Sequence, residues 1–126
     1  MDNDKFIAAY KESRNGTEHF YLNKLMPKFF YSDGVKECAE TGCYWLLMRM
    51  GTEVLKVFKQ RNEYLAIVTV VVAASKAVIT TTFKEEDPDP FIMTVDLTDM
   101  PEGEWNFYIY NEGPEFGFRC ILPSEY

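Results

Sequence analysis

The chain contains few of the side chains that enzymes use as nucleophiles or general bases. His19 is the only histidine, and the cysteines are Cys38, Cys43 and Cys120. His19 could form half of a general-base pair with Glu18, and a nearby thiol could act as a nucleophile. However, a single histidine among aromatic residues is more typical of packing, and small cysteines on helix faces are typical of a core. The sequence therefore predicts no catalytic site.

Metal and cofactor motifs are also missing. Asp87 with Asp89, and Asp96 with Asp99, offer carboxylates at short spacing, but this spacing lacks the glycine and terminal glutamate of an EF-hand loop. There is no CxxC pair for zinc, no GxGxxG or GxxxxGK[ST] motif for phosphates and no GxSxG motif of a hydrolase. We therefore expect neither a metal site nor a cofactor.

Charge is distributed unevenly along the 126 residues, whose net charge is −7. Residues 1–83 carry 11 basic and 9 acidic side chains, whereas residues 84–126 carry 2 basic and 11 acidic ones. Such an acidic half repels nucleic acid and attracts a protein with a basic surface. An acidic surface that only keeps the protein in solution is the alternative, and it requires no partner.

The residues expected to contact such a partner come from one loop and two strands. The segment 85–90 contains two prolines and four acids, so it cannot continue a β-ladder and should form an exposed loop. Its acids would attract the partner, while tyrosines on an open sheet face would serve as buried anchors. The predicted partner-binding residues are Glu85, Glu86, Asp87, Asp89, Asp96, Tyr108 and Tyr110.

Helical patterns fill the first half of the chain. Residues 4–14 have apolar spacing typical of a helix that ends at the turn signal Asn15–Gly16. Residues 18–31 are aromatic and contain a proline, which predicts an extended arm or short strand. A brief helix is expected over 34–41, capped by Ser32 or Asp33 and ended by Gly42. The strongest helical pattern covers residues 43–60.

Strand patterns fill the second half. Residues 64–73 and 77–83 are rich in β-branched side chains and should pair as a hairpin. Alternating patterns follow over 91–97, 105–110 and 116–122. These runs predict a meander of about five antiparallel strands.

Helices grouped before strands predict a single α+β domain over residues 1–126. Two or three N-terminal helices would pack on one face of the C-terminal antiparallel sheet. The other face should be partly open and should display Thr94, Asp96, Asn106, Tyr108, Tyr110, Arg119 and Ile121.

Several features predict a location in the cytoplasm. The longest apolar run, residues 64–74, has eleven residues, whereas a membrane-spanning helix needs about 18–20. The first residues are acidic and lack the basic start and apolar centre of a secretory signal. An odd number of cysteines argues against a disulfide framework, so reduced thiols are expected.

Four segments resemble an uncharacterised family of small bacterial and phage proteins. They are the segments Gly16–Tyr21 (GTEHFY), Tyr31–Lys36 (YSDGVK), Tyr44–Leu47 (YWLL) and Leu122–Tyr126 (LPSEY). Between these segments, the strands resemble those of the family mainly in the general character of their residues. The resemblance implies a phage, plasmid or genomic-island setting and no known activity, so it assigns no catalytic residues.

Together these observations favour a non-enzymatic acidic protein that binds and inhibits a nucleic-acid-handling protein of the host, as anti-CRISPR proteins do. The expected partner has a basic surface, and neither nucleic acid nor a membrane is expected to bind directly. A self-associating structural or regulatory module, such as a homodimer formed through the open face or an edge strand, is the alternative. An enzyme that uses His19 is a third possibility.

Overall fold

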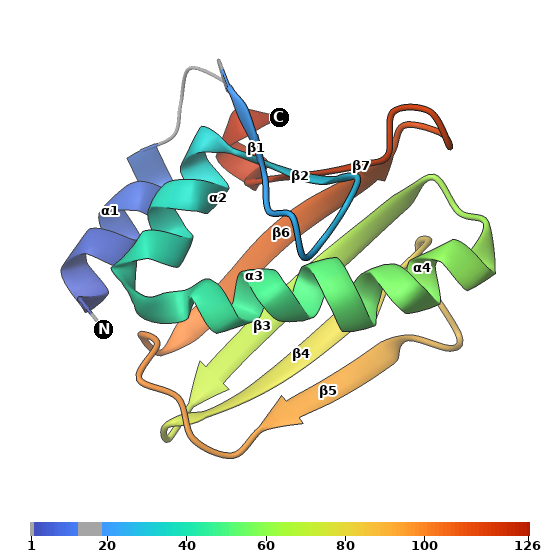
Figure 1. Cartoon of the computed structure of the whole chain (residues 1–126). Helices are drawn as coiled ribbons and strands as arrows, with labels where there is room; N and C mark the ends of the chain where they lie inside the picture. The colour runs from blue at the N-terminus through green and yellow to red at the C-terminus, as the bar shows by residue number, and fades with distance from the viewer. Residues whose placement is uncertain (1, 13–18) are drawn as a thin grey trace.

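A computed structural model describes residues 2–12 and 19–126, and it places the helices on one face of a β-sheet (Figure 1). This arrangement confirms the predicted α+β class. The helical layer consists of α1 (Asn3–Glu12), α2 (Asp33–Cys38), η1 (Ala39–Cys43), α3 (Tyr44–Arg49), η2 (Met50–Val54) and α4 (Leu55–Arg61). None of the helices in these residues is long and apolar enough to cross a membrane.

The segments from α2 to α4 follow one another in a single long helical stretch. Ser32 caps α2 as predicted, since its Oγ accepts a hydrogen bond from the Val35 N–H at 3.2 Å. Gly42 has the expected positive φ of 126°, but it produces a kink in η1 and the chain continues into α3. Six apolar residues that share one side of the helical pattern over 43–60 are buried: Leu46, Leu47, Met50, Val54, Leu55 and Phe58. The predicted end of α1 at Arg14 lies outside the described residues.

Within the part of the chain that the structure describes, the sheet has seven strands. They are β1 (Phe20–Leu22), β2 (Phe29–Ser32), β3 (Leu65–Ala73), β4 (Lys76–Thr82), β5 (Phe91–Val95), β6 (Gly103–Asn111) and β7 (Phe118–Ile121). Their order across the sheet is β1-β2-β7-β6-β3-β4-β5. The predicted hairpin of β3 and β4 is confirmed, with Val71 paired to Val78.

The predicted five-stranded antiparallel meander is wrong in three respects. The segment 18–31 supplies two strands to the sheet, and β2 pairs in parallel with β7. Strand β6 pairs with β3 and not with β5, so the connection after β5 crosses the end of the hairpin. There the Thr98 N–H donates to the Ser75 carbonyl at 2.8 Å. Hydrophobic periodicity detects strands but contains no information about which distant strands pair.

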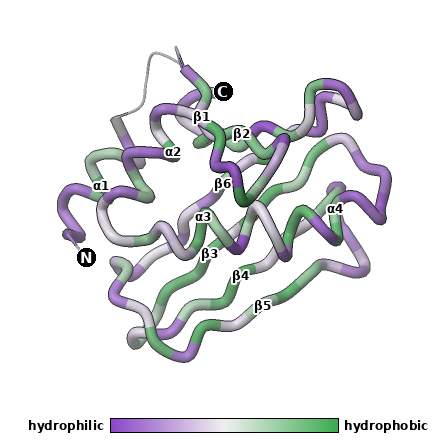
Figure 2. The backbone as a smooth tube through the Cα atoms, in the orientation of Figure 1, coloured by the Kyte–Doolittle hydropathy of each residue, from purple (hydrophilic) through white to green (hydrophobic). Residues whose placement is uncertain are grey.

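The core lies between the helices and the sheet. Figure 2 shows hydrophobic segments along β3 and β4, beneath the helices. Phe58 of α4 is fully buried, and its ring centroid lies 5.2 Å from that of Phe118 and 5.4 Å from that of Phe83. The alternating patterns over 91–97 and 116–122 are longer than the strands, because β5 ends at Val95 and β7 begins at Phe118, so Leu97 and Phe116 are exposed.

Candidate functional site

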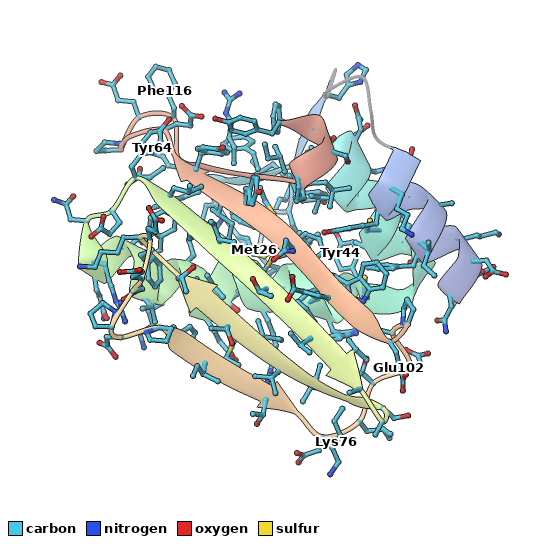
Figure 3. All side chains as sticks on the ribbon, turned by 180° about the vertical axis from the view of Figure 1, so that it is seen from behind. Met26, Tyr44, Tyr64, Lys76, Glu102 and Phe116 are labelled. Carbon is cyan, nitrogen blue, oxygen red and sulfur yellow. The ribbon has the colours of Figure 1, made fainter. Side chains whose placement is uncertain are left out.

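One face of the sheet is left uncovered by the helices. Apart from the C-terminal turn η3 (Pro123–Glu125), no element within residues 2–12 and 19–126 packs on it, as the rear view in Figure 3 shows. We call this surface the open face. It consists of alternate β3 residues (Leu65, Ile67, Thr69 and Val71) and the residues that lie level with them on the other strands. The predicted members Thr94, Asn106, Tyr108, Tyr110, Arg119 and Ile121 are all confirmed there by the strand register.

The open face mixes apolar and β-branched side chains with polar ones, among them the exposed Glu104, which pairs with Val71. Val71 and Val78 are direct cross-strand partners and both are exposed, as is Ile92 on the neighbouring strand. At the centre, Thr69 Oγ1 donates to Asn106 Oδ1 at 2.7 Å, so these polar groups are already paired. Contiguous exposed apolar surface of this kind is typical of protein interaction sites.

Tyrosines gather at the Leu65 end of the open face. The ring of Tyr126 lies 6.2 Å from that of Tyr108 and 6.2 Å from that of Tyr110. Together with Leu65 and Ile67 they line a groove of about 300 Å³. Burial, followed by the neighbouring Tyr126, raises the pKa of Tyr110 to about 12, so its hydroxyl remains a neutral donor.

The acidic loop 84–90 is ordered by Asp87, whose side chain is only 2% exposed. The carboxylate of Asp87 accepts hydrogen bonds from the N–H groups of Phe83 and Asp89, each at 2.9 Å, and lies 3.6 Å from Arg61 Nη1. Asp89 is 88% exposed and lies 3.4 Å from Arg61 Nη2. Asp87 therefore holds the loop to α4, whereas Glu85, Glu86 and Asp89 face solvent.

Asp87→Asn is expected to reduce the dependence of stability on pH below about 4. The N–H groups of Phe83 and Asp89, assisted by Arg61, hold the pKa of Asp87 below its ordinary value of 3.8. Because the folded-state pKa is depressed, this carboxylate stabilises the fold above the unfolded-state pKa. The contribution is lost as the pH falls through the folded-state pKa. Urea unfolding at a series of acid pH values would show a shallower slope for Asp87→Asn than for the wild type. Equal slopes for Asp87→Asn and the wild type would contradict the assignment.

The acidic loop and the tyrosines both lie beside Leu65 and Ile67 of β3. A second groove, of about 550 Å³, is lined by Leu65, Ile67, Glu85, Glu86 and other residues of 82–87. Leu65 and Ile67 also line the tyrosine groove, so the two predicted groups flank one stretch of β3. We call this combined surface the acidic–tyrosine margin of the open face.

Asp96 does not belong to this margin. It follows the end of β5, and Val95 pairs with Ala77 near the opposite end of the β3–β4 hairpin. There Asp96 lines a separate groove that also contains Trp45 and Leu97. The structure therefore brings together five of the seven predicted residues at one end, leaves Asp89 beside Arg61 outside both grooves, and places Asp96 at the other end.

His19 and Asp33 are the described residues that come closest to a general-base pair. His19 Nδ1 lies 3.8 Å from Asp33 Oδ2, which is longer than a hydrogen bond. The same carboxylate accepts hydrogen bonds from the His19 backbone N–H at 3.1 Å and from the Tyr21 hydroxyl at 2.8 Å. This geometry favours a role for Asp33 in joining the start of β1 to α2. Glu18, the other candidate, lies outside the described residues.

Glu125 joins the C-terminal turn to the start of α2. Its Oε1 accepts hydrogen bonds from Ser32 Oγ at 2.5 Å and from the Leu122 N–H at 2.9 Å, and its Oε2 accepts one from the Gly34 N–H at 3.2 Å. Three segments noted in the sequence, those containing His19, Ser32 and Glu125, therefore converge around the first turn of α2. The contacts among them account for the position of η3 beside the open face.

The cysteines lie in the core. Burial raises the pKa of all three thiols, that of Cys43 to about 12. Because the thiolate is the nucleophilic form, these thiols are unreactive at neutral pH. Among the residues that the structure describes, no group of three or more His, Cys, Asp or Glu side chains could hold a metal ion.

Sequence reasoning missed Leu65, Ile67 and Tyr126 as parts of the site. Leu65 and Ile67 could not be identified because they belong to a continuous apolar run, in which both faces of the strand carry apolar residues. Tyr126 reaches the tyrosine groove only because the Glu125 contacts turn the chain beside the sheet. No local sequence signal distinguishes Leu65 and Ile67 from their apolar neighbours, because only the pairing of β3 with β6 places them level with Tyr110 and Tyr108.

Comparison with known proteins identifies a family but no activity. No curated protein and no solved structure matches the chain. The sequence profile of a family of unknown function, DUF6876, matches residues 8–126 and so includes the whole sheet and most of the helical layer. The chain therefore belongs to the DUF6876 family.

Proposed function

We propose that the chain is a non-enzymatic acidic interaction protein that binds a partner with a basic surface through its open face. By covering a surface that the partner uses for nucleic-acid phosphates, it would inhibit a nucleic-acid-handling protein of a bacterial host. Anti-CRISPR and other anti-defence proteins of phages and mobile elements act in this way. The main support is the acidic–tyrosine margin, where exposed Glu85 and Glu86 adjoin Tyr108 and Tyr110 across Leu65.

The size of the open face is appropriate for a protein partner. Seven strands spaced about 4.8 Å apart span about 30 Å, and strands of these lengths extend roughly 10–30 Å. The resulting area is on the order of 600 Å², somewhat below the roughly 800 Å² that each partner buries in a standard interface.

The chemistry of the face favours a basic protein over other occupants. Exposed apolar side chains at Val71, Val78 and Ile92, to one side of the central Thr69–Asn106 pair, can replace water with side-chain contacts. The acidic margin at the opposite end would attract a positively charged surface and increase the association rate. Tyrosines are enriched among the residues that contribute most to binding, and Tyr108 and Tyr110 lie at this acidic end, level with Ile67 and Leu65.

The test is capture of partners from a nuclease-treated bacterial lysate, followed by affinity measurements with the purified partner. Glu85→Gln/Glu86→Gln is compared with Glu37→Gln/Glu53→Gln, which neutralises two exposed acids in the helical layer. We expect the first double variant to bind about ten-fold more weakly, mainly through slower association, and to lose much of the salt dependence. The second should bind as the wild type does. Asp87 is kept unchanged because it orders the loop.

To show that the chain inhibits its partner, and does not only bind it, a competition experiment is needed. Increasing amounts of the wild-type chain should displace a labelled oligonucleotide from the captured partner, and Glu85→Gln/Glu86→Gln should displace it less well. Equal affinity of both double variants, or a partner that binds nucleic acid and this chain simultaneously, would contradict the proposal.

Self-association is the alternative, and strand β5 is the observation that favours it. Phe91–Val95 forms an edge of the sheet and carries no charge. Acids flank this strand on both sides, at Asp89 and Asp96, so antiparallel pairing with a second copy would bring like charges together. Light scattering that shows a stable dimer, disrupted by Ile92→Lys in β5, would support this alternative over the basic partner.

A further inference from the structure

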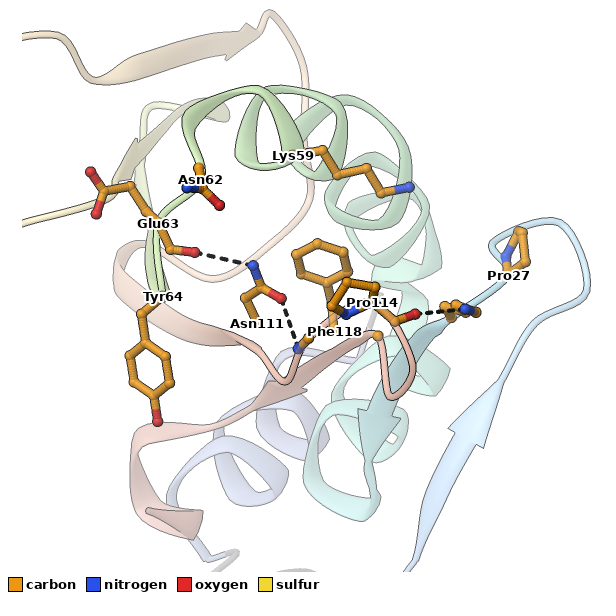
Figure 4. Close-up of a pocket in the computed structure, with 11 residues that line it drawn as sticks. Pro27, Lys59, Asn62, Glu63, Tyr64, Asn111, Pro114 and Phe118 are labelled. Carbon is orange, nitrogen blue, oxygen red and sulfur yellow. Dashed lines mark hydrogen bonds between the residues drawn. The ribbon is translucent and has the colours of Figure 1, made fainter.

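A pocket of about 810 Å³ lies at the end of α4, away from the centre of the open face (Figure 4). It is lined by three segments that are distant in sequence: the β1–β2 connection, the end of α4, and the β6–β7 connection. This volume is within the range of about 300–1,000 Å³ that is typical of small-molecule sites. Neither the acidic loop nor Tyr108 and Tyr110 line it.

The three segments are joined by hydrogen bonds that do not depend on a ligand. The Phe118 N–H donates to the Lys28 carbonyl at 2.8 Å, and Lys28 Nζ donates to the Pro114 carbonyl at 2.6 Å. Asn111 Nδ2 donates to the Glu63 carbonyl at 3.2 Å. At Gly117, which has a φ of 79°, an added Cβ would collide with the Lys28 backbone. The pocket is therefore preformed, which reduces the entropic cost of binding.

The walls of the pocket combine an apolar floor with positive charge on one side. Phe118, Pro27 and Pro114 provide flat apolar surfaces. Lys59 Nζ lies 5.9 Å from the centre of the Phe118 ring, and Lys28 is the second ammonium group of the lining. The Glu63 side chain, the one carboxylate among the lining residues, points away from Phe118 in Figure 4. A net positive pocket is unexpected in a chain whose net charge is −7.

We propose that this pocket binds a small aromatic carboxylate. The ring would lie against Phe118 and the two prolines, and the carboxylate would accept a charge-assisted hydrogen bond from Lys59 Nζ. Because the Lys28 ammonium already donates to Pro114, Lys59 is the main determinant of the preference for an anion. Its lining shares no residue with the acidic–tyrosine margin, although the ring of Tyr64 lies 5.8 Å from that of Tyr110, so the pocket can exist whether or not the proposed partner does.

The test uses naphthoate as the probe, with naphthamide as its neutral isostere and naphthylmethylammonium as its cationic one. Binding is followed by backbone amide chemical shifts of the isotope-labelled chain. Naphthoate should cause saturable shifts at Lys59, Gly117 and Phe118, with an affinity about ten-fold higher than that of naphthamide. The cationic isostere should bind most weakly.

Two lysines of α4 provide a matched pair of variants. Lys59→Met should weaken naphthoate binding about ten-fold and leave naphthamide binding nearly unchanged. Lys56→Met removes an equally exposed lysine of the same helix that does not line the pocket, and it should leave both affinities unchanged. The proposal is overturned if naphthoate shifts the open-face residues instead, if the two lysine variants behave alike, or if no saturable binding occurs at millimolar naphthoate.

Discussion

Phe58→Ala is expected to lower the free energy of unfolding by about 3–5 kcal/mol. The side chain is fully buried and packs between Phe83, which precedes the acidic loop, and Phe118 at the start of β7. Alanine would leave a cavity that these rings fill only in part. Since domains of this size are stabilised by about 5–15 kcal/mol, the variant would retain little of its stability. Urea unfolding followed by circular dichroism measures the difference.

Phe116→Ala is the matched control for this experiment. Phe116 is 60% exposed in the loop before β7, so its truncation should change the free energy of unfolding by less than about 0.5 kcal/mol. Similar losses for the two variants would mean that α4 does not pack on the sheet as described. The position of Phe118 beneath α4, and with it the shape of the Lys59 pocket, would then also be in doubt.

Glu125→Ala is expected to lower the free energy of unfolding by about 2–3 kcal/mol. The change removes the acceptor of three hydrogen bonds and leaves the hydroxyl of Ser32, which is fully buried, without that partner. It also releases the turn that positions Tyr126 against Tyr108 and Tyr110. A thermal or urea unfolding series gives the stability change, and the aromatic shifts of these tyrosines report the second effect.

Glu115→Ala controls for the loss of one negative charge, because Glu115 is exposed in the β6–β7 connection. It should unfold like the wild type. A double-mutant cycle with Ser32→Ala would show whether Ser32 and Glu125 are coupled. Additive effects of the two substitutions would contradict the hydrogen bond between them.

The candidate site could be predicted only in part. Charge counts identified the segment 85–89, and period-2 alternation placed Tyr108 and Tyr110 on the solvent side of their strand. The inward orientation of Asp87 could not be predicted, because it depends on Arg61 of α4 and on the turn made by the loop itself. A carboxylate in a charged run has the same sequence appearance whether it faces solvent or closes a turn.

The sequence by itself determined the helix over 43–60, its buried side, the β3–β4 hairpin and the side of β6 that faces the core. These features depend on local spacing, since side chains three or four residues apart share a helix face and alternate residues share a strand face. Only the tertiary structure decided the seven-strand order, the parallel pairing of β2 with β7 and the position of β6 beside β3. It also decided that the acidic loop, the C-terminal tyrosine and the start of β3 form one surface. These contacts join residues that are far apart in the chain. They are selected by the packing energy of the whole fold, which no local sequence pattern contains.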